Sequence, residues 1–168
     1  IKESVAAIVA DLRMALNELR ELAQGIHPSV LTEEGLEAAL LSLAERSPVP
    51  ARILAAPMER FAPGVEAAAY FVVSEALSNA AKHAEATEVT IGVQNVDFRL
   101  VVEVRDDGRG GADPAKGTGL RGLADRVAAV NGRLEVKSSP GDGTTVVAEI
   151  PCDPASAPAS EAEETTVQ

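Results

Sequence analysis

A helix predicted over residues 64–84 carries a line of polar side chains on a surface that is otherwise apolar. At about 100° per residue, Glu75, Asn79 and Lys82 fall within a narrow sector, while Val73 and Leu77 lie on the opposite side. The apolar side must be covered by a core, and the polar side then brings together a carboxylate, an amide and an amine. This pattern favours a metal and phosphate site roofed by the core.

Glycine-rich segments follow this helix at three places in the chain. Residues 106–110 (DDGRG) put an acid where an alternating strand ends, and residues 117–122 (GTGLRG) open another predicted helix. The third glycine-rich segment is residues 141–145 (GDGTT). Glycine lets the backbone approach a nucleotide closely, and a helix N-terminus attracts phosphate, so these segments indicate a nucleotide site.

In this order and at these distances, the segments resemble the N, G1 and G2 boxes of the GHKL ATPase superfamily. Within it they are similar to the catalytic and ATP-binding domain of sensor histidine kinases of the nitrate/nitrite-sensor (NarX-like) class, over roughly residues 20–151. The resemblance implies an α+β fold, a two-layer α/β sandwich (Bergerat/GHKL ATP-binding fold) preceded by one amphipathic helix. The implied ATP lid, residues 111–116, is short and lacks a phenylalanine-containing box, as in the NarX-like class.

The local patterns predict helices on one layer and strands on the other. Apolar residues at spacings of three and four predict an amphipathic helix over residues 1–24, and Thr32 is predicted to cap a helix that runs to Arg46. A further helix is predicted over 119–131. Strands are predicted over 51–55, 88–94, 98–106, 133–138 and 144–150, with a turn at 95–97.

The chain divides into three parts. Residues 1–26 match the second helix of a dimerisation and phosphotransfer hairpin in the resembled family, with a packing helix of the same domain as the alternative. Residues 27–151 are predicted to form the GHKL ATP-binding catalytic domain. Residues 152–168 are predicted to be a disordered acidic tail, because they hold too little apolar surface to offset the entropy of ordering. Since the chain starts at Ile1, we expect a fragment of a longer protein.

Charge and composition narrow the function further. The formal net charge of −11 argues against nucleic acid as a partner, because phosphate backbones call for a basic surface. No run of about 18 apolar residues and no signal peptide is found, so we expect a cytoplasmic fragment without membrane contact. The single cysteine, Cys152, excludes a disulfide framework.

The predicted metal and phosphate ligands lie on the helix of residues 64–84. Mg²⁺ takes few protein oxygens, and the resemblance implies that Asn79 is its ligand. For Glu75 the resemblance leaves two roles open, orienting a water or a metal-bound group, or polarising the attacking nucleophile. Lys82 falls where the family places a cation on the phosphates, and His83 either bonds a phosphate oxygen or is structural.

Asp106 is the predicted adenine ligand, because the exocyclic amine is a donor and a carboxylate only accepts. Its neighbour Asp107 is expected to face solvent. Gly108 and Gly110 allow the chain to turn beneath the base, and Thr144 resembles the threonine that supports the adenine acid.

The phosphates are expected to meet the positive end of the helix that follows residue 116. The residues predicted to bind there are Gly117, Thr118, Gly119, Leu120, Arg121 and Gly122. Arg121 either reaches the phosphates or caps the lid.

The two histidines, His27 and His83, lack the acidic neighbour that follows a phosphoacceptor in the resembled class, so the acceptor is expected upstream. The resemblance implies the catalytic domain of a two-component sensor histidine kinase that uses ATP and Mg²⁺. Its expected partners are its own phosphotransfer helix, a homodimer partner and a response regulator. The alternatives are a stand-alone GHKL serine kinase of the anti-sigma type and a nucleotide-sensing module without phosphotransfer.

Overall fold

The structure is a computed structural model that describes residues 29–112 and 118–152. The helix predicted over residues 1–24, His27, Gly117 and the predicted tail beyond Cys152 lie outside these residues. Within the described ranges, no helix is both long enough and apolar enough to span a bilayer.

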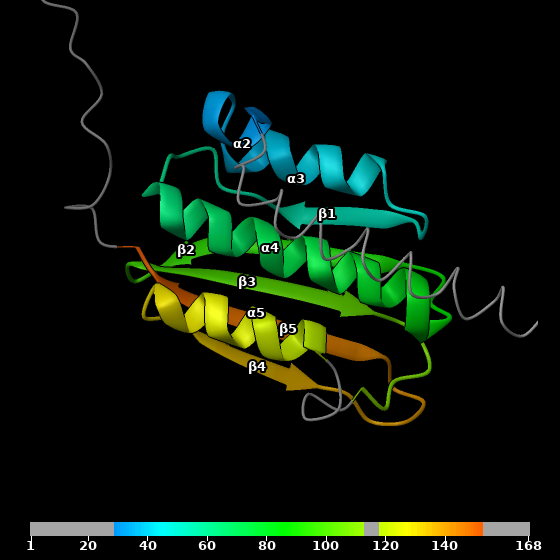
Figure 1. The fold of residues 1–168 in the computed structure, drawn as a ribbon. Helices are drawn as coiled ribbons and strands as arrows, with labels where there is room; N and C mark the ends of the chain where they lie inside the picture. Colours follow the sequence, from blue (N-terminus) through cyan, green and yellow to red (C-terminus); the bar gives the residue numbers. More distant parts are fainter. Residues whose placement is uncertain (1–28, 113–117, 153–168) are drawn as a thin grey trace, which may run out of the picture.

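Five strands of the described residues form one sheet in the order β1-β2-β3-β5-β4 (Figure 1). The strands are β1 (Ala51–Ala55), β2 (Val89–Val96), β3 (Arg99–Asp106), β4 (Arg133–Lys137) and β5 (Thr144–Pro151). The edge strand β1 runs parallel to β2, and the other pairs are antiparallel. Every second residue of β3, from Leu100 to Asp106, is buried, as expected for a sheet with one covered face.

The helices lie together on that covered face (Figure 1). They are α2 (Ser29–Glu33), α3 (Leu36–Glu45), α4 (Pro63–Asn79), the π-helical turn η1 (Ala80–Ala84) and α5 (Thr118–Ala129). α4 contacts β3 and β5 in the middle of the sheet, while α3 packs on β1 and α5 on β4. The predicted α+β two-layer sandwich is therefore confirmed.

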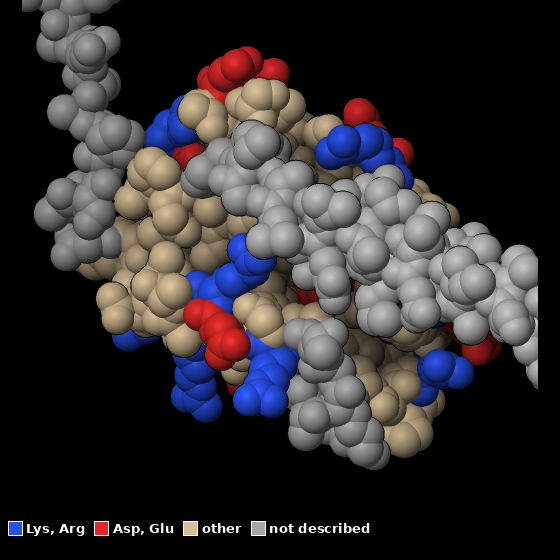
Figure 2. All heavy atoms as spheres, in the orientation of Figure 1, with Lys and Arg blue, Asp and Glu red and all other residues tan. Residues whose placement is uncertain are grey.

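Aliphatic side chains fill most of the core between the layers. Val72 and Val73 of α4 and Ile91 of β2 are fully buried, and Phe61 is the one aromatic residue in the core of the described part. Cys152, which the sequence assigns to the tail, is buried, and its amide donates to Phe98 O (2.8 Å). On the face in Figure 2, cations and anions are interspersed outside the undescribed atoms, so the acidic excess forms no single-sign field there.

The prediction of one helix from Thr32 to Arg46 is wrong, because the structure contains two helices. α2 ends when the amides of Glu34 and Gly35 both close on Val30 O, at 2.8 and 3.2 Å. Gly35 then takes a φ of 89°, a left-handed conformation that favours glycine, before α3 begins. Thr32 lies inside α2 and does not cap the second helix.

The turn predicted at residues 95–97 lies further along the chain. Val96 of β2 pairs with Arg99 of β3, so the connection is a two-residue turn of Asp97 and Phe98. Both have positive φ, 50° and 60°, as a type I′ turn requires. The usual Asn-Gly signal is absent, which explains the shift.

The predicted helix of residues 64–84 changes character before it ends. It is α-helical to Asn79 and continues as the π-helical η1, a form often found at functional sites. The wider turn rotates Lys82 and His83 relative to their positions in a regular α-helix. Both side chains are exposed and have no partner within the described residues.

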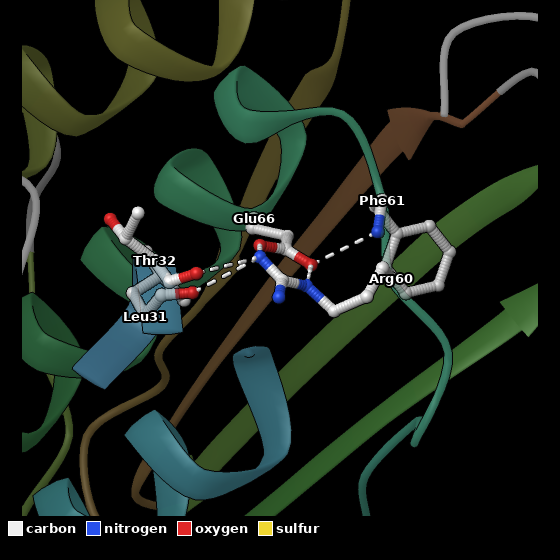
Figure 3. Close-up of polar contacts among 5 residues, drawn as sticks. All are labelled: Leu31, Thr32, Arg60, Phe61 and Glu66. Atoms are coloured by element: carbon white, nitrogen blue, oxygen red, sulfur yellow. Dashed lines mark hydrogen bonds and ion pairs between the residues drawn. The ribbon is translucent and has the colours of Figure 1, made fainter. Parts of the chain in front are cut away.

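An ion pair between the buried Glu66 and the exposed Arg60 joins α4 to the segment before it (Figure 3). Glu66, in the first turn of α4, is 2% exposed, and its Oε1 accepts from Arg60 Nε (2.9 Å) and Phe61 N (3.0 Å). Arg60 Nη2 donates to Glu66 Oε2 (3.2 Å) and to the carbonyls of Leu31 and Thr32 (3.4 and 3.3 Å). One guanidinium therefore joins α2, the loop before α4 and the start of α4.

Candidate functional site

The site lies at the end of the sheet where β3 ends and β5 begins. Asp106, the last residue of β3, faces the helix layer and is 8% exposed. Its Oδ1 accepts from the amides of Gly108 (2.9 Å) and Thr144 (3.2 Å). Among the described residues, Oδ2 has no hydrogen-bond partner, yet it is not sealed from solvent. The two amide bonds to Oδ1 hold the Asp106 carboxylate in place, and its Oδ2 can accept a hydrogen bond from a ligand.

Asp107 points away from Asp106 and is exposed, as predicted, but it also has a structural role. Its carboxylate accepts from Thr87 Oγ1, from Thr87 N (2.7 Å) and from Glu88 N (3.0 Å), which anchors the loop that enters β2. These bonds, led by the Thr87 hydroxyl, lower the pKa of Asp107 to about 2. Asp106 thus belongs to the candidate site, whereas Asp107 anchors the loop before β2.

The segment after Asp107 passes between η1 and the β4–β5 turn. Arg109 N donates to Ala84 O (2.7 Å), and Arg109 O accepts from Gly141 N (2.7 Å). At Gly108 any Cβ would collide with Ala84 O, so the approach of this segment to η1 requires glycine. Gly110 takes a positive φ of 64°, and a Cβ there would collide with Ser139 O, so the turn after Asp106 requires glycine at this position too.

The predicted metal ligand lies on α4, one helical turn from its neighbouring acid. Asn79 Nδ2 donates to Glu75 Oε1 (3.2 Å), and both side chains are half-buried. This bond uses the amide nitrogen of Asn79 and leaves its Oδ1, the atom that a hard cation prefers, for another ligand. The described residues contain no cluster of three or more acidic, histidine or cysteine groups that could hold a metal.

The N-terminus of α5 meets this pair. Gly119, in the first turn of α5, lies so close to Glu75 that a Cβ there would collide with Glu75 Oε1. The first amides of a helix have no intrahelical partner and attract anions, so the donors at the start of α5 lie near the Glu75 carboxylate. Leu120 and Gly122 are half-buried and Arg121 is exposed, while Gly117 and the side chain of Thr118 lie outside the described residues.

Sequence reasoning missed Ser138, which follows β4. Its hydroxyl accepts from Ala112 N (2.9 Å), lies 2.9 Å from Thr144 Oγ1 and lies 3.4 Å from Gly143 O. Ser138 therefore connects the segment after Asp106 with the start of β5. No local sequence pattern predicts the bond from Ala112 N to Ser138, because the two residues are 26 positions apart.

The chain matches a known family model. The model of the histidine kinase-, DNA gyrase B- and HSP90-like ATPases matches residues 64–154, which include all of α4 except Pro63, as well as Asp106 and β5. The signal transduction histidine-protein kinase/phosphatase DegS of Brevibacillus brevis is 36% identical over 96 residues, 55% of this chain and 25% of DegS. The chain thus spans about a quarter of that relative.

Solved structures have a fold similar to that of this chain. The histidine kinase domain of the blue-light activated histidine kinase of Erythrobacter litoralis EL346 aligns with a TM-score of 0.59 at 25% identity, covering 70% of this chain and 59% of that one. The ATP binding domain of PrrB from Mycobacterium tuberculosis aligns with a TM-score of 0.54 at 22% identity, covering 70% of this chain and 91% of that one. The second likeness shows the fold alone.

Proposed function

The chain belongs to the histidine kinase-, DNA gyrase B- and HSP90-like ATPase family, and from this premise we propose that it is the ATP-binding catalytic domain of a two-component sensor histidine kinase. The observation that carries the proposal is Asp106, a buried carboxylate whose Oδ1 is held by two amides while its Oδ2 has no partner among the described residues. An acceptor fixed in this way selects the exocyclic amine of adenine over the O6 acceptor of guanine.

In the proposed complex, the triphosphate extends from Asp106 toward the N-terminus of α5. The amides of Gly119, Leu120 and their neighbours would donate to phosphate oxygens, with help from the positive end of the helix. Glu75 lies against Gly119, so an incoming phosphate would have to displace this carboxylate or share a cation with it. Lys82 and His83 are exposed one turn beyond Asn79 and supply cationic or hydrogen-bonding groups at the rim.

The oxygen donors at Asn79 and Glu75 suit Mg²⁺. Asn79 offers its Oδ1 because its nitrogen is bonded to Glu75 (3.2 Å), and the phosphates and water would supply the remaining oxygens. A Mg²⁺ ion held there would supply positive charge to offset that of the phosphates during phosphoryl transfer. The residues of the chain orient that charge: Asn79 positions the cation, and the α5 amides position the phosphates.

The histidine that accepts the phosphoryl group is proposed to lie outside this chain, on a companion phosphotransfer helix. DegS is named a histidine-protein kinase/phosphatase, and this chain spans a quarter of its length, so we propose that the kinase activity also needs segments that match other parts of DegS. A homodimer partner and a response regulator complete the proposed pathway. The NarX-like subclass remains a prediction from the sequence.

Incubation with radiolabelled ATP and Mg²⁺ tests whether this chain binds ATP while the accepting histidine lies on another segment. The chain should bind ATP but form no stable phosphohistidine, because phosphoryl transfer needs a nucleophile positioned in line with the γ-phosphate. Adding a separately prepared phosphotransfer hairpin should produce acid-labile, base-stable label on the hairpin. Label on His27 or His83 would contradict an upstream acceptor, and label on a serine of a partner protein would favour the anti-sigma alternative.

A further inference from the structure

We propose that the outer face of α4 is a docking surface for the apolar stripe of residues 1–24 of this same chain. The outer face is the side of α4 that is turned away from the sheet. Its residues are only half-buried and recur at helical spacing: Ala67, Tyr70, Phe71, Ser74 and Ser78. The proposal concerns how the chain packs, so it does not depend on the proposed ATP site.

α4 lacks the charged outer side that a surface helix normally has. Its only charged residues are Glu66, which is buried, and Glu75, which belongs to the candidate site. In the same layer, α5 exposes Arg121, Asp125 and Arg126 to solvent. In the described part of the chain α4 lies between α3 and α5, with the sheet behind it (Figure 1). A helix that is apolar on every side is normally buried, so α4 calls for a cover on its outer face.

Contacts with α5 hold the two aromatic rings of this face in place. The rings of Tyr70 and Phe71 lie edge to face, with centroids 5.8 Å apart, and Arg126 Cζ lies 4.6 Å from the centroid of Phe71. The remaining positions, such as Ala67 and Ser74, carry small side chains that let another helix approach closely.

Residues 1–24 carry a surface that is complementary to this face. Their apolar residues recur at spacings of three and four and predict a helix with one apolar side, which must be buried against another element. The residues of this stripe are Val5, Ile8, Leu12, Leu16, Leu19 and Leu22. A helix of that length would be roughly 36 Å long and α4 is about 25 Å long, so the stripe can follow the whole outer face.

The point at which this segment joins the described fold places it beside α4. Only residues 25–28 separate it from α2, and α2 contacts α4. Arg60 holds α2 there, because its guanidinium bonds the carbonyls of Leu31 and Thr32 and the carboxylate of Glu66 in the first turn of α4. Because the segment ends at the start of α4, it would run antiparallel to α4, with its earlier residues over the later turns.

Tyr70 allows a direct test, because it is the only tyrosine of the chain and the chain has no tryptophan. Acrylamide quenching of tyrosine fluorescence in the full chain therefore measures solvent access to the outer face of α4. Leu16→Glu places a carboxylate in the apolar stripe and should raise the quenching constant about twofold, because burying that charge would be costly and the segment would leave the face. Asn17→Glu adds the same charge on the opposite side of the predicted helix and should leave the quenching unchanged. Equal quenching in all three proteins would overturn the proposal.

Hydrogen exchange tests the contact from the side of α4. Ser74→Glu should accelerate exchange of residues 5–22 roughly tenfold, whereas Ala124→Glu, on the exposed side of α5, should not. The amides of β3 show in the same experiment whether the sheet is intact, and if Ser74→Glu does not fold, Leu16→Glu decides the question. Protection of residues 5–22 in the wild type should be independent of protein concentration. Protection that is lost on dilution would show that a second copy covers the face, and either that result or unprotected amides at every concentration would overturn the proposal.

Discussion

Two carboxylates are buried in the part of the chain that the structure describes, and they differ in what surrounds them. Glu66 has partners for both oxygens, the Arg60 guanidinium and the Phe61 amide. Asp106 has two amides on Oδ1, no ion pair, and no partner for Oδ2 among the described residues. Burying a charge raises the free energy of the folded state unless the charge has hydrogen-bond partners. Residues of the chain supply these partners to Glu66, whereas Oδ2 of Asp106 can still accept a bond from a ligand.

The contrast shows that burial alone does not identify a functional acid. Glu66 is 2% exposed and Asp106 is 8% exposed, so neither resembles a surface carboxylate. The two acids differ in their hydrogen-bond donors. A carboxylate with partners for both oxygens is typical of a structural contact, whereas a buried carboxylate with one unpaired, solvent-accessible oxygen is typical of a binding site. Changes to the Glu66 cluster should therefore alter stability, whereas changes at Asp106 should alter ligand binding.

The largest effect is expected from Arg60→Ala. Removing the guanidinium leaves the carboxylate of Glu66 buried with one amide donor, which should lower the free energy of unfolding by about 3 kcal/mol. We place the loss at the low end for buried pairs because the Arg60 side chain is 44% exposed. Urea unfolding measures it, and the ATP affinity of the folded protein should not change.

Arg52→Ala is the matched control for that variant. Arg52 pairs with Glu88 at 3.2 Å, but both side chains are exposed, so the loss should stay below about 1 kcal/mol. Equal losses in the two arginine variants would show that burial of Glu66 contributes nothing special.

A smaller effect, on metal dependence, is expected at Glu75. Glu75→Ala removes the acceptor that orients the Asn79 amide, so the gain in ADP affinity on adding Mg²⁺ should shrink roughly fivefold. Glu75→Gln retains an acceptor oxygen and should keep most of the gain. Glu85→Ala, which removes an exposed acid paired with Arg109 at 3.4 Å, serves as the control. Similar behaviour of the Ala and Gln variants would refute the orienting role.

The smallest effect concerns Asp107, the exposed neighbour of Asp106. Its pKa is lowered from 3.8 to about 2 in the folded protein, so its bonds stabilise the fold above about pH 4 and are lost as the pH falls toward 2. The stability difference between wild type and Asp107→Asn should therefore shrink across that interval. An NMR titration of the Asp107 carboxyl that gives an ordinary pKa would contradict this assignment.

The sequence predicted the layers and the strands because these depend on local patterns, and the same patterns singled out the candidate site residues. Alternation fixes the buried face of β3, and the acid at its end is recognised by the glycines that follow it. The missed features depend on contacts or conformations without a local signal. Arg60 reaches carbonyls 28 and 29 residues away, and the break at Gly35 and the turn at Asp97 and Phe98 resemble ordinary helix and strand sequence.

The role of Asp106 as the purine acceptor is tested most directly by calorimetric titration of ATP with Mg²⁺ into the wild type and Asp106→Asn. The asparagine can still accept from Gly108 and Thr144, so the variant should fold. Its ATP affinity should nevertheless fall roughly ten- to a hundred-fold, because a hydrogen bond to a charged group contributes about 1.5–3 kcal/mol. Equal ATP affinity in the two folded proteins would contradict the assignment of Asp106 to adenine.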